Sequence, residues 1–97
     1  MLGMDQMQLF DTHPYDTEPQ PSANAGVYCA MRGGLLKIGI SKNVSNRMRQ
    51  LGCDVVGVLP GWRAEEMRLH QRFAHLRVRN EWFMPDIEIL NEFRRAA

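Results

Sequence analysis

Residues 26–40 read GVYCAMRGGLLKIGI, two alternating runs that meet at Gly33-Gly34. A glycine pair suits a two-residue turn, because glycine accepts the positive φ values that the favoured hairpin turns require. The stretch therefore predicts a β-hairpin. With the glycine pair at its tip, Tyr28 lies opposite Gly39.

This hairpin has two different faces. One face carries only apolar side chains and is expected to pack on the core; its residues are Val27, Cys29, Met31, Leu36, Ile38 and Ile40. The other face carries Tyr28 and Lys37, and Gly39 adds no side chain beside the tyrosine. We therefore expect a notch next to a phenol and an ammonium group.

Helix and strand patterns alternate after the hairpin. Apolar residues at helical spacing over 44–51 predict a helix, which Ser41 or Asn43 can cap and Gly52 can end. Residues 54–59, DVVGVL, are rich in β-branched side chains and predict a third strand.

A longer helix is expected over about 63–78, followed by a short extended segment at 81–83 and a last helix that starts at Pro85. Four polar residues fall at helical spacing along one side of the longer helix: Arg63, Glu66, His70 and Arg77. Their side chains are expected to form a single stripe.

The first 25 residues differ from the rest of the chain. They contain several prolines and no helical or strand period, so residues 1–25 are predicted to form an acidic, flexible tail and residues 26–97 a single folded domain. The whole chain has a formal charge of +1, and residues 1–24 hold four acidic side chains without Lys or Arg, so residues 25–97 carry +5. This arginine-rich excess is compatible with a phosphate-bearing partner.

Composition also argues against several classes of protein. The sequence has no apolar run near the roughly eighteen residues of a membrane span and no signal-peptide pattern, so we expect a soluble, cytoplasmic protein without membrane contact. Cys29 and Cys53 are isolated, which argues against a zinc site or a disulfide framework. Both are expected to be reduced thiols.

The chain contains the residue types that phosphodiester hydrolysis needs. This reaction requires a positioned water, a group that stabilises charge developing on the phosphate, and usually a metal held by carboxylate oxygens. Four residues supply these groups: Tyr28, Lys37, Arg47 and Glu66.

The order and spacing of these residues resemble those of the GIY-YIG nucleases, which include phage homing endonucleases, a bacterial excision-repair nuclease and some restriction enzymes. Gly26-Val27-Tyr28 is similar to the first motif of that family. Lys37-Ile38-Gly39 resembles the second motif, in the form with lysine for its first tyrosine that marks a phage-associated subfamily. Arg47 stands eight residues after Gly39, where the family has an arginine.

The resemblance continues along the predicted long helix. Glu66 matches the metal-binding glutamate of the family. In the subfamily this glutamate is followed by a histidine, a phenylalanine and a Glu-Trp-Phe sequence, which here are His70, Phe73 and residues 81–83. The resemblance spans about residues 25–83.

The resemblance implies an α+β fold, with a small three-stranded antiparallel sheet flanked by helices. It implies a metal-dependent endonuclease acting on nucleic acid, DNA rather than RNA, in a bacterial or phage-infected cell. Tyr28 would orient or deprotonate the attacking water, while Arg47 and Lys37 neutralise the phosphate. Glu66 would hold Mg²⁺ or Mn²⁺. One carboxylate is enough because Mg²⁺ keeps several waters, so the metal affinity without nucleic acid should be low.

The sequence departs from the family at one expected base. Many members have a histidine or tyrosine four residues after the arginine, where this chain has Leu51. His70 could serve as the base from the neighbouring helix. Arg49, Arg63 and Glu81 could contact the substrate or support the site.

A second hypothesis is therefore a catalytically inactive domain of this fold that binds nucleic acid or a protein partner. Leu51 favours this alternative, whereas Tyr28, Arg47 and Glu66 favour the enzyme. The family's late asparagine corresponds to either Asn80 or Asn91.

The tail contains a candidate docking peptide. Its sequence QMQLF, with Gln6, Leu9 and Phe10 as the defining residues, resembles the Gln-x-x-Leu-Phe peptide by which replication and repair proteins bind the bacterial β sliding clamp. Two adjacent apolar anchors in a polar segment suit a peptide that orders on binding. The alternative is that Leu9 and Phe10 fold back onto the domain.

Overall fold

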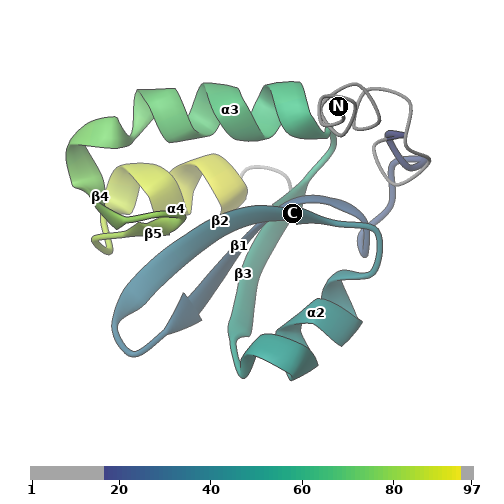
Figure 1. The fold of residues 1–97 in the computed structure, drawn as a ribbon, viewed down its shortest axis with the longest axis horizontal. Helices are drawn as coiled ribbons and strands as arrows, with labels where there is room; N and C mark the ends of the chain where they lie inside the picture. Colours follow the sequence, from purple (N-terminus) through teal and green to yellow (C-terminus); the bar gives the residue numbers. More distant parts are fainter. Residues whose placement is uncertain (1–16, 95–97) are drawn as a thin grey trace, which may run out of the picture.

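The computed structural model describes residues 17–94. The candidate clamp-binding residues Gln6, Leu9 and Phe10 lie outside this range. The elements, in chain order, are β1 (Gly26–Arg32), β2 (Leu35–Ser41), α2 (Val44–Leu51), β3 (Asp54–Leu59), α3 (Arg63–Arg72), the 3₁₀ turn η2 (Ala74–Leu76), β4 (Arg77–Arg79), β5 (Trp82–Phe83) and α4 (Ile87–Arg94), as Figure 1 shows. In the described part of the chain, the helices lack the length and apolarity needed to cross a membrane.

The hairpin of β1 and β2 has the predicted register. Tyr28 pairs with Gly39 and Ala30 pairs with Lys37 in an antiparallel ladder. Residues Gly33 and Gly34 form the turn with φ values of 59° and 80°, which glycine adopts readily. The sequence pattern and the turn chemistry therefore determine this register together.

The prediction of a three-stranded sheet is wrong, because the sheet has five antiparallel strands in the order β3-β1-β2-β5-β4. The two additional strands form a short hairpin at the end of the sheet. The inner strand of this hairpin, β5, pairs with β2 through Leu36–Phe83 and Lys37–Trp82. The outer strand β4 then pairs with β5. The fold remains α+β.

The helix predicted over about residues 63–78 also ends earlier than expected. It ends at Arg72, and the chain turns through η2 before entering β4. Phe73, at the end of α3, is fully buried, so the change of direction occurs at a core residue. Arg77 consequently lies on β4 and not on the helical stripe that the sequence predicts. The last helix begins at Ile87, two residues after Pro85.

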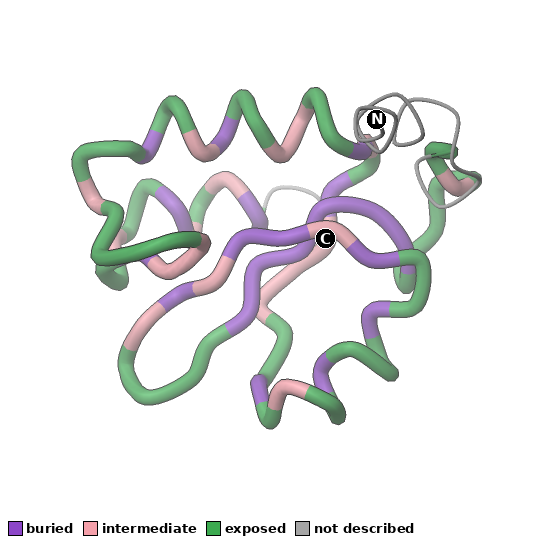
Figure 2. The backbone as a smooth tube through the Cα atoms, viewed as in Figure 1, coloured by how far each residue is buried: buried purple, intermediate pink, exposed green. Residues whose placement is uncertain are grey.

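Helices cover both faces of the sheet (Figure 1). On the face of α3 and α4, the apolar side of the hairpin forms the larger core cluster with Leu69, Phe73, Phe83 and Phe93. Met31, which was expected to join this core, is exposed near the tip of the hairpin. On the opposite face, α2 contributes Val44 and Met48 to a smaller cluster that contains Tyr28, Ala30 and Cys53. Figure 2 shows the resulting band of buried residues along the central strands. The tyrosine face of the hairpin is therefore also a packed face.

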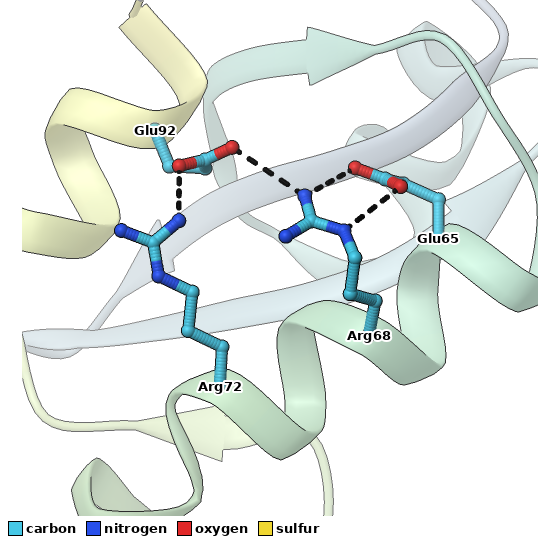
Figure 3. A network of polar contacts seen from close by, with 4 residues as sticks. All are labelled: Glu65, Arg68, Arg72 and Glu92. Atoms are coloured by element: carbon cyan, nitrogen blue, oxygen red, sulfur yellow. Dashed lines mark hydrogen bonds and ion pairs between the residues drawn. The ribbon is translucent and has the colours of Figure 1, made fainter.

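Ion pairs join α3 to α4 outside this core (Figure 3). Glu92 of α4 accepts from Arg72 at 2.5 Å and lies 3.5 Å from Arg68, while Arg68 also pairs with Glu65 one turn earlier on α3 at 2.6 Å. This arginine–glutamate network holds the C-terminal helix against the helix that carries Glu66.

Candidate active site

A pocket of about 550 Å³ lies where the end of β2, helix α2 and the start of α3 meet. Its lining combines cationic, acidic and amide side chains with two aromatic ones: Tyr28, Ile40, Ser41, Lys42, Asn43, Asn46, Arg47, Gln50, Trp62, Arg63, Glu66 and Glu81. Of the residues predicted to form a site, Tyr28, Arg47, Arg63, Glu66 and Glu81 are thus brought together.

Tyr28 forms the inner wall of this pocket with only 1% of its surface exposed. Its ring lies directly over Gly39, where a Cβ atom would come 2.7 Å from the tyrosine oxygen and 2.9 Å from Cζ. The notch expected beside Gly39 is therefore filled by the tyrosine ring. Glycine is required here because the aromatic ring needs the space that a side chain would occupy.

The first motif glycine also has a steric role. Gly26 has a φ of 139°, and a Cβ atom there would lie 2.3 Å from the carbonyl oxygen of Leu59. Any larger residue would push β1 away from β3 at the point where the chain enters the sheet. Gly26 thereby fixes the strand on which Tyr28 is carried.

Burial raises the pKa of Tyr28 to about 12, although the neighbouring Arg47 guanidinium, which hydrogen-bonds the phenol, acts in the opposite direction. Desolvation wins because the phenolate would lose more hydration than one arginine restores. At neutral pH the tyrosine is therefore a neutral hydroxyl group, able to donate or accept a hydrogen bond.

Helix α2 places Arg47 at the pocket. Its start is capped by Asn43, whose Oδ1 accepts from the backbone N–H of Asn46 at 3.1 Å. Asn24 braces the same turn, because its side-chain oxygen accepts from the Ser45 N–H and hydroxyl groups at 2.8 Å each. Sequence reasoning assigned Asn24 to the tail and missed this contact, which depends on residues far apart in the chain.

Glu66 occupies the first turn of α3, where its backbone N–H donates to the Trp62 carbonyl at 2.9 Å. Burial and the nearby carboxylate of Glu81 raise the pKa of Glu66, while the charges of Arg63 and Lys37 oppose that shift. A half-buried carboxylate next to a second carboxylate is a group that a bound cation would stabilise.

Lys37 lies outside the pocket lining but controls one of its acids. Its ammonium group pairs with the carboxylate of Glu81 and lies 5.6 Å from the centre of the Trp82 ring. The Lys37 side chain is only 13% exposed. Its charge is therefore directed at Glu81 and not at open solvent.

His70 also lies outside the lining, and both of its ring nitrogens are engaged. Nε2 lies 3.0 Å from the carbonyl oxygen of Ile38, and Nδ1 lies 3.1 Å from an Arg77 guanidinium nitrogen. Because Arg77 can only donate, this arrangement selects the neutral ring with its proton on Nε2. Such a ring links α3 to the sheet rather than facing the pocket.

Arg49 is likewise not among the lining residues, and its guanidinium group lies 3.4 Å from the side-chain oxygen of the lining residue Asn46. Sequence reasoning missed the pocket role of Trp62, which is 8% exposed. The Trp62 indole N–H is buried without a hydrogen-bond partner among residues 17–94. The tertiary structure places Trp62 in the pocket lining together with Arg63 and Glu66.

The donor set fits a hard divalent cation that takes most of its ligands from outside the protein. Within residues 17–94, no three His, Cys, Asp or Glu side chains gather as an enclosed metal site. The pocket instead offers the carboxylates of Glu66 and Glu81. One or two carboxylates, with waters and substrate phosphate oxygens, are a usual environment for Mg²⁺.

Comparison with known proteins supplies one match. The family model described as the T5orf172 domain matches residues 25–97. No curated protein and no solved structure matches the chain. The family match covers the sheet, the described helices and every residue of the pocket lining.

Proposed function

The chain belongs to the T5orf172 domain family, and from this premise and the pocket chemistry we propose that it is a metal-dependent endonuclease of the GIY-YIG type. Its substrate is nucleic acid, and DNA is the better candidate. The observation that carries the proposal is the convergence of Tyr28, Arg47 and Glu66, from three separate elements, on one pocket.

Each of these residues has a role that its surroundings support. Arg47 binds the phosphate, because a guanidinium group can donate two parallel hydrogen bonds to phosphate oxygens. Tyr28, held as a neutral hydroxyl, orients the attacking water or a phosphate oxygen by hydrogen bonding. Glu66 holds Mg²⁺ or Mn²⁺, which when bound stabilises the charge that develops on the phosphate.

The remaining cations support the same substrate. Arg63 and Lys42 line the pocket beside Arg47 and extend its basic wall. Lys37 contributes indirectly by holding the carboxylate of Glu81. His70 connects the helix of Glu66 to the backbone of β2, so it acts on the position of Glu66.

A binding domain without catalysis is the second candidate, and three observations favour it. Leu51 stands where many GIY-YIG nucleases have a histidine or tyrosine. Tyr28 is not ionised at neutral pH, and both ring nitrogens of His70 are engaged in hydrogen bonds. Hydrolysis needs a base that accepts a proton from the attacking water, and these features do not identify one. Phosphate binding by Arg47 needs no base.

The decisive experiment incubates the purified full chain with single- and double-stranded DNA and RNA, in Mg²⁺, in Mn²⁺ and in chelator. We expect cleavage only with the ion, and a loss of about a hundredfold or more in Glu66→Gln and in Arg47→Ala, because the first removes a ligand of the ion and the second removes the cation that binds the phosphate. Glu88→Gln and Arg94→Ala, which change the same charges on α4, serve as controls.

The outcomes separate the two candidates. Equal cleavage by the wild type and Glu66→Gln would remove the metal mechanism. Binding that depends on Arg47, with no cleavage of any substrate under any condition, would select the binding domain.

A further inference from the structure

Two carboxylates share the pocket although they come from different parts of the fold. Glu66 is on the first turn of α3, and Glu81 is in the turn between β4 and β5. Both carboxylates line the same pocket, so they lie on the walls of one cavity. Such an arrangement is stabilised when a cation lies between the two groups.

Two contacts with β2 fix Glu81 in place, and a third contact holds its partner Lys37. Its backbone carbonyl accepts from the Ile38 N–H at 3.1 Å. Its Oε1 pairs with the ammonium group of Lys37. Lys37 in turn lies over the ring of Trp82, which is its partner in the β2–β5 ladder.

These contacts use Oε1 and the backbone of Glu81, so the second carboxylate oxygen, Oε2, is not the atom that pairs with Lys37. Lys37 is almost enclosed, with 13% of its side chain exposed, while the Glu81 side chain is 43% exposed. The lysine therefore orients the carboxylate without covering it. The missed hairpin of β4 and β5 is the element that brings this second acid to the pocket.

We propose that Glu81 is a second protein ligand of the divalent ion, acting together with Glu66, and that Lys37 is a positioning residue for Glu81. The proposal rests on the proposed function, because that function supplies the reason for a cation at Glu66. The proposal extends that function by assigning two carboxylates to the ion instead of one. Affinity for the ion should then be measurable without nucleic acid.

The test titrates the full chain with Mn²⁺ in the absence of nucleic acid and follows the electron paramagnetic resonance signal of the free ion. We expect one site in the wild type, weakened roughly tenfold or more in Glu81→Gln and in Glu66→Gln. Glu88→Gln, which removes a carboxylate from the exposed surface of α4, should bind as the wild type does.

A charge-balanced variant separates ligation from a general electrostatic effect. Glu81→Gln leaves the Lys37 charge without its partner, and that charge alone would repel a cation. The double variant Lys37→Met with Glu81→Gln has the same net charge as the wild type. We expect its Mn²⁺ affinity to stay as low as that of Glu81→Gln; recovery to the wild-type value would overturn ligation by Glu81.

One further variant and a control for folding make the outcome decisive. Glu81→Asp keeps the charge but retracts the carboxylate by one methylene group, so it should bind Mn²⁺ more weakly than the wild type while keeping the thermal stability of the fold. Unfolding curves without metal show whether each variant is folded. Wild-type affinity in a folded Glu81→Asp and in a folded Glu81→Gln would overturn the proposal.

The result is distinguishable from failure of the proposed function. If Glu66→Gln loses Mn²⁺ and Glu81→Gln retains it, the inference about Glu81 fails and the metal-dependent nuclease stands. If the wild type binds no Mn²⁺ without nucleic acid, the two-carboxylate site is likewise overturned. Cleavage, measured separately with saturating ion, decides the nuclease proposal.

Discussion

Tyr28 belongs to the core and to the pocket at the same time. Its ring packs with Ala30, Val44 and Met48, and its hydroxyl group meets Arg47 at the pocket wall. Gly39 makes this possible by leaving room for the ring. The close approach of ring and backbone explains why tyrosine and glycine face each other in the two motif strands.

The ionisation of Tyr28 is the prediction at this scale. The chain has two tyrosines, so Tyr15→Phe leaves Tyr28 as the only phenol. A titration of the folded protein by near-ultraviolet absorbance should show phenolate with a pKa of about 12, against 10.0 for an ordinary tyrosine, because burial disfavours the charged form. Phenolate formation below pH 10 in the folded protein would contradict the buried neutral hydroxyl.

The same shift makes stability depend on pH in a defined window. Since the folded-state pKa is raised, the unfolded chain ionises first, and the stabilisation is complete below pH 10 and is lost as the pH rises towards 12. Chemical unfolding at several pH values should show a steeper loss of free energy of unfolding in this window for Tyr15→Phe than for the double variant that also carries Tyr28→Phe.

At the scale of elements, the sequence predicts β1 and β2 in full and β4 not at all. Alternating apolar residues and a glycine pair specify the first hairpin because one face is buried and the turn fixes the register. In β4, all three residues from Arg77 to Arg79 are exposed, so no pattern of burial marks a strand. Its existence follows only from pairing with β5, which itself needs β2.

The arginine–glutamate network of α3 and α4 gives the prediction at this scale. Glu92→Gln should lower the free energy of unfolding by about 0.5–1 kcal/mol, because the two arginines that it pairs with are each partly in solvent. Urea unfolding at low and high salt measures this loss, which should shrink at high salt. Glu88→Gln on the same helix is the control.

The network and the pocket should be independent of one another. Glu92 lies outside the pocket lining, so Glu92→Gln should leave Mn²⁺ affinity unchanged. If Glu92→Gln instead lowers the free energy of unfolding equally at low and high salt, packing and not ion pairing accounts for the loss of stability.

At the scale of the whole molecule, the site assembles from segments that are separate in sequence. Its lining residues come from β1, the end of β2, α2, the start of α3 and the turn before β5. Sequence spacing could identify Tyr28, Arg47 and Glu66, because each matches a motif position of the GIY-YIG nucleases. It could not identify Asn24 or Trp62, because their positions depend on how the helices pack against the sheet.

Under the proposed function, the charge distribution favours contacts with a phosphate backbone over recognition of bases. Residues 25–97 carry a formal charge of +5, with Lys42, Arg47 and Arg63 gathered at the pocket. A domain of this size has little further surface for reading base edges, so phosphate contacts should provide most of the affinity. Oligonucleotides of equal length and different sequence should therefore bind with similar dissociation constants.

The salt dependence of binding tests this directly. Fluorescence anisotropy with labelled DNA in chelator, so that no cleavage occurs, should show affinity falling linearly with salt on logarithmic axes. Arg47→Ala should weaken binding about equally for all sequences and reduce the slope by about one, because one phosphate contact is lost. Arg94→Ala, on α4 and outside the pocket lining, should change the slope less. If the two substitutions reduce the slope equally, the basic charge acts through the overall field of the domain and the pocket is not where the phosphate binds.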